Sequence, residues 1–170
     1  MNYSAIKYCD IANGTGVRTV LFVSGCRNRC EGCFQPDTWN FENGEVFDAK
    51  VEDEILKSLE PAYVAGLTLL GGDPFEEENQ EGLLPFLRKV KKAFPQKSIW
   101  AFTGYLLPDL EDGGKKHTED TDEMLSYIDV LVDGPFIQAQ KNIALKFRGS
   151  ENQRLIDMKV YRETGEIKEI

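Results

Sequence analysis

Four short runs of apolar residues stand out along the chain, each bounded by polar or turn-forming residues. They cover residues 19–23, 66–70, 98–102 and 128–132. A short continuous apolar run is typical of a strand buried on both faces, as in a parallel sheet. The pattern therefore predicts four buried strands.

Apolar residues at helical spacing occupy the segments between these runs. One helix is predicted to begin at Asp48 and to end before Pro61, because the residue before a proline avoids helical geometry. A second helix covers about residues 78–93, and a third begins near Thr121. Strands and helices that alternate along a chain predict an α/β fold with right-handed crossover connections.

Two regions depart from this alternation. Residues 109–122 are polar and are expected to form a mobile loop. Near the C-terminus, residues 154–156 and 158–161 have the pattern of two short strands. No internal repeat or linker-like segment interrupts the chain, so residues 1–170 are expected to form a single domain.

Length and composition are those of an ordinary globular domain. A chain of 170 residues, 41% apolar and 29% charged, can bury a core without metals or disulfides. The 20 basic and 29 acidic side chains give a net charge of −9, which argues against broad binding to nucleic-acid phosphates. No apolar run could span a bilayer and no signal-peptide pattern is present, so we expect a cytoplasmic protein with neither a membrane nor a nucleic-acid partner.

The cysteines carry the strongest chemical information. Cys26, Cys30 and Cys33 follow the first predicted strand, at the strand end where α/β folds place their functional groups. Clustered thiols in a cytosolic chain point to metal or redox chemistry, and three thiolates can converge on one soft metal centre. Because no fourth ligand is evident, they favour an iron–sulfur cluster with one open iron. A structural zinc site completed by Cys9 or His117 is the alternative.

Motifs along nearly the whole chain resemble one family. The residues that carry the resemblance are 10–18, 21–26, 30–34, 38–39, 71–74, 103–105, 132–136, 147–150 and 152–154. Together with the three-then-two spacing of the cysteines, they are similar to the activating proteins of glycyl-radical enzymes, which belong to the radical S-adenosylmethionine superfamily. Within that group they most resemble the members that act on anaerobic ribonucleoside-triphosphate reductase.

The resemblance implies a complete activity. Cys26, Cys30 and Cys33 would hold a [4Fe-4S] cluster whose fourth iron binds S-adenosylmethionine. One electron from the cluster would yield methionine and a 5′-deoxyadenosyl radical, which would generate a glycyl radical on the large subunit of the reductase. A one-electron reductant such as flavodoxin is a further implied partner, and no side chain beyond cluster and cofactor is implied to be catalytic. Members of this superfamily use a partial (β/α) barrel, and a closed eight-stranded barrel needs about 250 residues, so we expect a truncated, open barrel of mostly parallel strands.

The resemblance also assigns residues around the cofactor. The implied cofactor contacts are Gly32, Cys33, Phe34, Gly71, Gly72, Asp73, Pro74, Thr103 and Asp133. The implied contacts with the glycine loop of the partner are Asp10, Gly14, Gly16 and Arg18. A monovalent cation is implied near Thr103 and Asp133, although these two residues are equally suited to capping strand ends. Asp73 stands where the family usually has glutamate, which favours its backbone over its shorter side chain as the contact.

Other functions stay open at this point. Activation of a different glycyl-radical enzyme would use the same chemistry. A zinc knuckle or a ferredoxin-like carrier would need a fourth protein ligand and would have no use for residues 71–74 at a strand end. A radical enzyme with a small-molecule substrate is disfavoured by the short chain, because few elements remain to enclose that substrate, whereas an open site suits a loop inserted by a protein.

Overall fold

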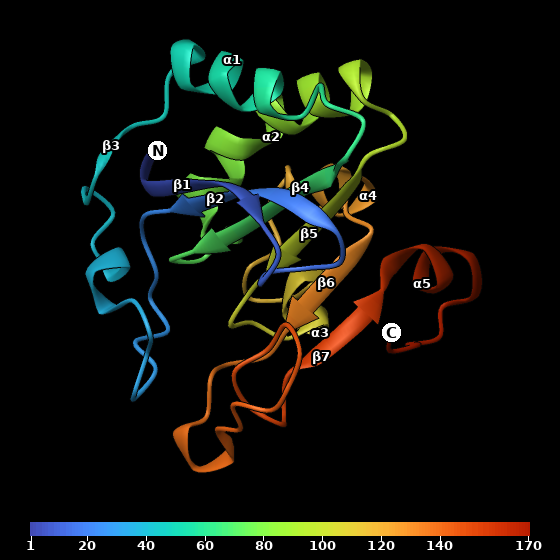
Figure 1. Ribbon diagram of the computed structural model, residues 1–170. Helices are drawn as coiled ribbons and strands as arrows, with labels where there is room; N and C mark the ends of the chain where they lie inside the picture. Colours follow the sequence, from blue (N-terminus) through green and yellow to red (C-terminus); the bar gives the residue numbers. More distant parts are fainter.

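A computed structural model describes all residues from Met1 to Ile170 and contains one open sheet with helices against it (Figure 1). The strands are β1 (Asn2–Asp10), β2 (Val17–Val23), β3 (Glu45–Val46), β4 (Val64–Gly71), β5 (Ser98–Phe102), β6 (Val130–Asp133) and β7 (Arg154–Asp157). The helices are α1 (Ala49–Ser58), α2 (Glu77–Ala93), α3 (Leu107–Leu110), α4 (Thr121–Ser126) and α5 (Met158–Thr164), with 3-10 turns η1 (Pro36–Trp39) and η2 (Gln138–Gln140). No helix combines the length and the apolar character that crossing a membrane would require.

The sheet is mixed. Its strands lie in the order β3-β1-β2-β4-β5-β6-β7. The central pairings β2–β4, β4–β5 and β5–β6 are parallel, whereas β1–β2, β1–β3 and β6–β7 are antiparallel. The expected partial, open (β/α) barrel of mostly parallel strands is therefore wrong, because half of the strand pairings are antiparallel.

The connections at the two edges explain this correction. Parallel neighbours need a crossover connection, usually a helix, and antiparallel neighbours do not. Residues 11–16 join β1 to β2 without any helix, and residues 134–153 join β6 to β7 with only the short turn η2. Strand β2 thus returns antiparallel beside β1, and the edge strand β7 returns antiparallel beside β6. Strand β1 was missed because none of its residues is buried, so it leaves no apolar run in the sequence.

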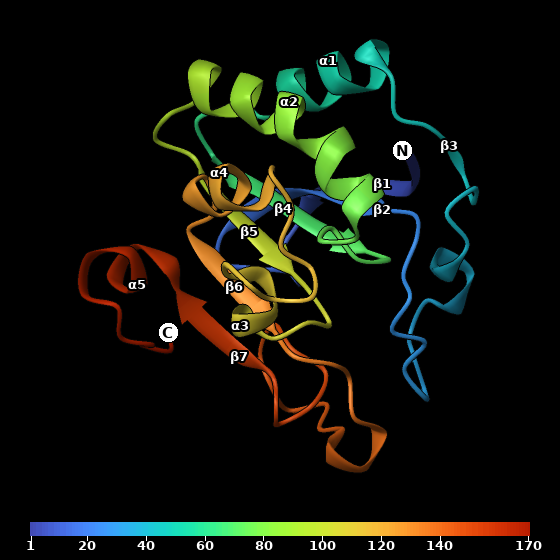
Figure 2. The same ribbon diagram turned by 180° about the vertical axis from the view of Figure 1, so that it is seen from behind.

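Helices α1, α2 and α4 cover one face of the sheet, where the main core lies (Figure 2). Helix α1 begins as predicted, since the side chain of Asp48 accepts a hydrogen bond from the backbone N–H of Val51 at 3.0 Å. Helix α2 and strand β5 also match the predicted ranges closely. Buried side chains from these helices and from β2, β4, β5 and β6 form a single apolar cluster. This face supplies the rigid support of the sheet.

The opposite face has a much smaller apolar cluster. Trp100, Val130, Val132 and Leu155 form it, and Phe102 and Phe147 pack against its edge. Loops rather than long helices cover this side, and the segment 134–153 leaves the sheet at the same end as the loop that follows β2 (Figures 1 and 2). An incompletely filled face of this kind leaves room for a cavity.

Two predictions near the C-terminal half have different outcomes. Residues 154–156 form a strand as expected, but residues 158–161 lie in helix α5 and not in a strand. Asp157 caps that helix by accepting a hydrogen bond from the N–H of Val160 at 3.1 Å, and Gly165 ends it in the left-handed conformation.

The polar segment 109–122 is anchored at Lys116, whose Nζ donates to Glu76 and whose carbonyl accepts from Gln80.

Candidate functional site

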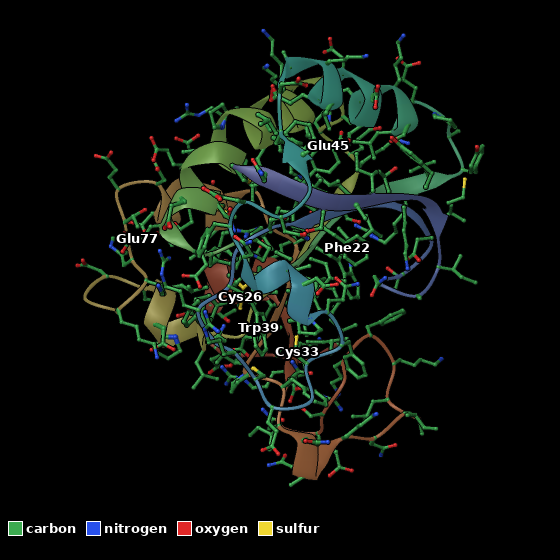
Figure 3. The ribbon with its side chains drawn as sticks, turned by 90° about the vertical axis from the view of Figure 1, so that its left-hand side faces the viewer. Phe22, Cys26, Cys33, Trp39, Glu45 and Glu77 are labelled. Atoms are coloured by element: carbon green, nitrogen blue, oxygen red, sulfur yellow. The ribbon has the colours of Figure 1, made fainter.

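The three clustered cysteines lie in the loop between β2 and β3, residues 24–44, which we call the cysteine loop (Figure 3). Strand β2 ends at Val23, so the loop starts at the carboxyl ends of the parallel strands. There the loop faces a cavity of about 550 Å³, the inner cavity. The inner cavity is lined by Cys26, Cys30 and Cys33 together with Gly71, Gly72, Asp73 and Thr103 from the ends of β4 and β5.

The thiols share this cavity in a half-buried state. Burial raises the pKa of Cys26 to about 12, and nearby Asp73 acts in the same direction. Burial also raises the pKa of Cys30, against a backbone hydrogen bond from Phe136. A positively charged metal centre would offset this cost of ionising the thiols. As the side chains stand, no three His, Cys, Asp or Glu residues lie close enough together to hold a metal ion.

The residues considered for a fourth zinc ligand lie elsewhere. Cys9 is exposed on β1 and does not line the inner cavity. The Nε2 atom of His117 lies 3.0 Å from a carboxylate oxygen of Asp122, in the segment before α4. Neither Cys9 nor His117 therefore lies with Cys26, Cys30 and Cys33 in the inner cavity.

Glycines allow the cysteine loop to approach the end of β4 closely. The N–H of Asp73 donates to the carbonyl oxygen of Gly25 at 2.8 Å, and the N–H of Gly72 donates to that of Val23 at 2.7 Å. A Cβ atom on Gly72 would lie only 2.5 Å from the Gly25 oxygen. Glycine at position 72 is thus required for the contact that places the cysteine loop against the strand.

Asp73 is occupied by the protein itself. Its side chain has no exposed surface, and it accepts hydrogen bonds from Thr103 Oγ1 at 2.9 and 3.0 Å and from the Gly104 N–H at 2.8 Å. The Phe75 N–H and the Asn28 side chain donate to it as well. Burial raises the pKa of Asp73 to about 7, and the hydrogen bonds oppose that rise. This carboxylate therefore ties the ends of β4 and β5 to the cysteine loop.

Asp133 has a similar internal role at the end of β6. Its fully buried carboxylate accepts two hydrogen bonds from Arg154 on β7, at 2.9 and 2.6 Å, and one from the N–H of Leu107. Asp133 does not line the inner cavity, and the buried Pro74 does not line it either. Of the two strand-end residues considered together in the sequence, only Thr103 reaches the cavity.

Phe34 and Gly32 lie on the outer part of the cysteine loop. Phe34 is 64% exposed, yet it lines the inner cavity and packs against Phe136 with ring centroids 5.0 Å apart. Gly32 has a positive φ and does not line the cavity. A Cβ at position 32 would meet the side chain of Gln138. Phe34 is thus the residue through which this part of the loop reaches the cavity.

The residues predicted to contact a partner loop divide into surface and interior positions. Asp10 accepts hydrogen bonds from the N–H groups of Ala12 and Asn13, and these two residues line the inner cavity. Gly14 is buried, Gly16 is exposed, and neither lines the cavity. The turn at residues 10–16 therefore reaches the cavity through Ala12 and Asn13, which the sequence did not single out.

Arg18 is buried rather than available to a partner. It has no exposed surface, and its guanidinium lies 5.6 Å from the centre of the Trp100 ring. All of its donors are used by neutral acceptors: Thr15 O, Leu67 O, Thr68 Oγ1, Ser98 O and Ser98 Oγ, at 2.8 to 3.1 Å. Burial lowers its pKa to about 10. Arg18 therefore joins the turn before β2 to strands β4 and β5.

Sequence reasoning missed two residues at the start of α2 that hold the cysteine loop, one just before the helix and one in its first turn. Glu76, the residue before the helix, accepts a hydrogen bond from the N–H of Arg27. Asn79 donates to the carbonyl oxygens of Ser24 and Gly25. An acidic residue at a helix start is ordinary helix chemistry, so the sequence offered no sign that Glu76 reaches a distant loop.

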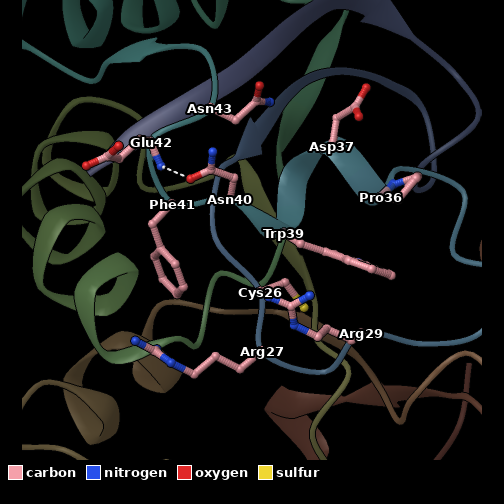
Figure 4. Close-up of a pocket in the computed structure, with 10 residues that line it drawn as sticks. All are labelled: Cys26, Arg27, Arg29, Pro36, Asp37, Trp39, Asn40, Phe41, Glu42 and Asn43. Carbon is pink, nitrogen blue, oxygen red and sulfur yellow. Dashed lines mark hydrogen bonds between the residues drawn. The ribbon is translucent and has the colours of Figure 1, made fainter.

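A second cavity, the outer groove, has a volume of about 810 Å³ and lies along the other side of the cysteine loop (Figure 4). Cys26 and Trp39 line both cavities. In the outer groove, Arg27 lies 4.4 Å from the centre of the Phe41 ring, and Arg29 lies 5.5 Å from that of Trp39. The wall at Cys26 therefore faces an open surface as well as the interior.

The inner cavity suits a soft metal centre and a small organic cofactor. Three thiols are ligands of the kind that iron–sulfur clusters use. A volume of about 550 Å³ lies within the usual range for small-molecule sites. Gly71, Gly72 and the aromatic ring of Phe34 also line it. The three thiols and the volume of the inner cavity thus fit an iron–sulfur cluster and a small organic cofactor.

Comparisons with known proteins cover nearly the whole chain. Residues 12–156 match the family described as a 4Fe-4S single cluster domain. A protein of Enterobacteria phage T4 is 43% identical over 157 residues, 91% of this chain and 93% of the relative. A protein of Haemophilus influenzae is 44% identical over 155 residues, 90% of this chain and 96% of the relative, and one of Escherichia coli is 37% identical over the same shares. All three relatives are named anaerobic ribonucleoside-triphosphate reductase-activating protein.

Proposed function

The chain belongs to the family of anaerobic ribonucleoside-triphosphate reductase-activating proteins, and from this premise we propose that it is an enzyme that generates a glycyl radical on such a reductase. The observation that carries the proposal is that three cysteines and two strand-end glycines line one cavity. The large subunit of the reductase is its protein substrate. Both act in the cytoplasm.

Cys26, Cys30 and Cys33 are the proposed ligands of a [4Fe-4S] cluster with one open iron. When bound, this group would supply the single electron for reductive cleavage of S-adenosylmethionine, and the radical chemistry that follows would remove a hydrogen atom from the partner glycine. The chain's own residues position the cofactor and keep water away from it. The half-buried state of the three thiols supports this role.

The carbonyl oxygens of Gly71 and Gly72 are the proposed acceptors for the ammonium group of S-adenosylmethionine, and Phe34 is the proposed contact for its adenine. Both positions line the inner cavity next to the cysteines. Asp73 acts behind them by fixing the strand ends, since its carboxylate is already saturated by protein donors. A monovalent cation at Asp133 would have to compete with Arg154 for both carboxylate oxygens.

The partner glycine loop is proposed to enter past Ala12 and Asn13, which line the inner cavity. Asp10 holds that turn in shape through its two backbone hydrogen bonds. A one-electron carrier such as flavodoxin is the proposed reductant. The outer groove supports this assignment, because it gives such a carrier a path to Cys26 from outside.

The decisive experiment is anaerobic reconstitution with iron and sulfide, followed by reduction with S-adenosylmethionine and the reductase. We expect about four irons per chain, release of methionine, and a glycyl-radical signal by electron paramagnetic resonance (EPR) in the reductase. Cys30→Ala should lose cofactor cleavage, and Cys9→Ala, the matched control, should keep it. Stoichiometric zinc that depends on Cys9 or His117, or full cleavage by the Cys30→Ala variant, would overturn the proposal.

A further inference from the structure

Glu76 is a buried carboxylate that joins four parts of the molecule. It precedes α2 and has no exposed surface. Its Oε2 accepts a hydrogen bond from the N–H of Arg27 at 2.6 Å and from the hydroxyl of Tyr105 at 2.9 Å. Its Oε1 accepts from Nζ of Lys116 at 2.8 Å and from the Arg27 side chain at 3.2 Å. A buried carboxylate with this many partners is held in one place.

The contact with Arg27 matters because Arg27 directly follows Cys26. On the other side of Cys26, the side chain of Asn79 donates to the carbonyl oxygens of Ser24 and Gly25 at 3.1 and 3.3 Å. Both Glu76 and Asn79 belong to the start of α2, whose other end is packed in the main core. Residues at the start of α2 therefore form hydrogen bonds with the backbone on both sides of Cys26.

Glu76 is also charged. Burial alone would raise its pKa, but the hydrogen bonds from Lys116, Arg27 and Tyr105 lower it below its ordinary value. Lys116 is the cation closest to it and is itself mostly buried, with 14% of its side chain exposed. Arg27 is shared with Glu78, whose side chain is 48% exposed. The negative charge of Glu76 is thus buried next to Arg27, the residue that follows Cys26.

We propose that Glu76 is a positioning residue for the cluster: it fixes the backbone next to Cys26, and its charge makes the cluster bound there harder to reduce. The inference rests on the proposed function, because it assumes that Cys26 is a cluster ligand. Reduction adds a negative charge to the cluster, and a buried negative charge close by repels it. Lys116 offsets part of this repulsion, so removal of Lys116 must act in the opposite direction.

The test uses four variants of the reconstituted protein. Glu76→Gln keeps an oxygen that can accept from the Arg27 N–H but removes the charge. Glu76→Ala removes both. Lys116→Met removes the compensating cation, and Glu78→Gln is the matched control, since it removes an exposed charge that also pairs with Arg27.

The measured quantity is the reduced fraction of the cluster at fixed applied potentials, read by EPR. For Glu76→Gln we expect the ratio of reduced to oxidised cluster to rise on the order of tenfold, which corresponds to about 59 mV for one electron. Lys116→Met should lower the ratio, and Glu78→Gln should change it by less than half as much. Opposite signs for the first two variants identify charge as the cause, because loosening of the loop has no reason to change sign.

Hydrogen exchange of the metal-free protein tests the positioning on its own. Glu76→Ala should speed exchange in residues 24–33, and Glu76→Gln should leave it close to that of the parent protein. An unchanged or lower reduced fraction in Glu76→Gln, or unchanged exchange in Glu76→Ala, would overturn the inference. If the parent protein takes up no cluster, the proposed function fails, and the exchange measurement still decides whether Glu76 holds the loop.

Discussion

Replacing Arg18 with methionine is expected to destabilise the metal-free protein by about 3–5 kcal/mol. The guanidinium is fully buried and donates five hydrogen bonds to neutral acceptors of the turn before β2 and of strands β4 and β5. Each such bond contributes about 1 kcal/mol net, and the unpaired acceptors left behind add to the loss. Part of the loss is recovered because methionine, unlike a guanidinium, has no charge to remove from water.

Urea unfolding followed by circular dichroism measures this change. A loss of this size corresponds to a decrease of roughly 6–20 °C in Tm for a chain of this length. Arg18→Lys should give an intermediate loss, because an ammonium has three donors in place of five. The control is Arg88→Met, since Arg88 is 54% exposed and pairs with Glu123 on the surface, where an ion pair contributes about 1 kcal/mol or less.

The same variant separates two roles of Arg18. If Arg18 is internal support, stability and activation of the reductase fall together. If instead Arg18→Met unfolds within about 1 kcal/mol of the parent protein and fails only in activation, Arg18 contacts the partner loop. That result would refute the reasoning from burial and restore the role that the sequence motif implied.

Three further predictions concern the loop contact, a surface ion pair and a strand end. Gly72→Ala should reduce the iron content after reconstitution, because the added Cβ would lie 2.5 Å from the Gly25 carbonyl oxygen, whereas Gly113→Ala, which meets no atom within 4 Å, should not. Glu123 is held by Arg88, and that hydrogen bond lowers its pKa to about 2 from 4.5. Its contribution to stability is therefore present above about pH 4.5 and is lost as the pH falls toward 2, so the acid unfolding curve of Glu123→Gln should be flatter, and high salt should shrink the difference. Asp133→Asn should lose about 2–3 kcal/mol in urea unfolding by breaking its buried ion pair, yet leave the affinity for S-adenosylmethionine unchanged; a weaker affinity at equal stability would place Asp133 in the cofactor site.

The centre of the fold was predictable because its strands are buried on both faces. Strand β5 matched its apolar run, and β4 and β6 differ from theirs by one or two residues at each end. The edges were not predictable in the same way. Strand β1 has no buried residue, so its pairing with β2 depends on contacts distant in sequence and not on any local pattern. Sequence patterns also favoured a strand over residues 158–161, where the cap at Asp157 was the overlooked sign of a helix.

For the site, the sequence identified the cysteines that line the cavity, but it could not show which candidate binding residues are already hydrogen-bonded within the protein. Residue type and spacing singled out Cys26, Cys30 and Cys33, and the structure brings them to one cavity. Asp133 and Arg18 have side chains suited to binding a ligand, but each is saturated by protein groups that no sequence pattern displays. Glu76 is the converse case: an acidic residue is ordinary before a helix, and only the fold shows that it accepts a hydrogen bond from the N–H of Arg27 in the cysteine loop.

The wall of the inner cavity formed by residues 134–153 has a consequence for how the molecule opens. Only Gly134 and Ser150 are buried in that segment. Its contacts with the rest of the molecule include two aromatic pairs, Phe136 on Phe34 and Phe147 on Trp100, and the surface ion pair of Arg148 with Glu169. Aromatic pairs of this kind contribute about 0.5–1.5 kcal/mol each beyond their buried area. Because so little of this wall is buried, we expect it to open at a lower free energy than the helix-covered face, which holds the main core. Opening of this wall would therefore admit a loop of a large partner protein without disturbing the strands from whose ends the cysteine loop starts.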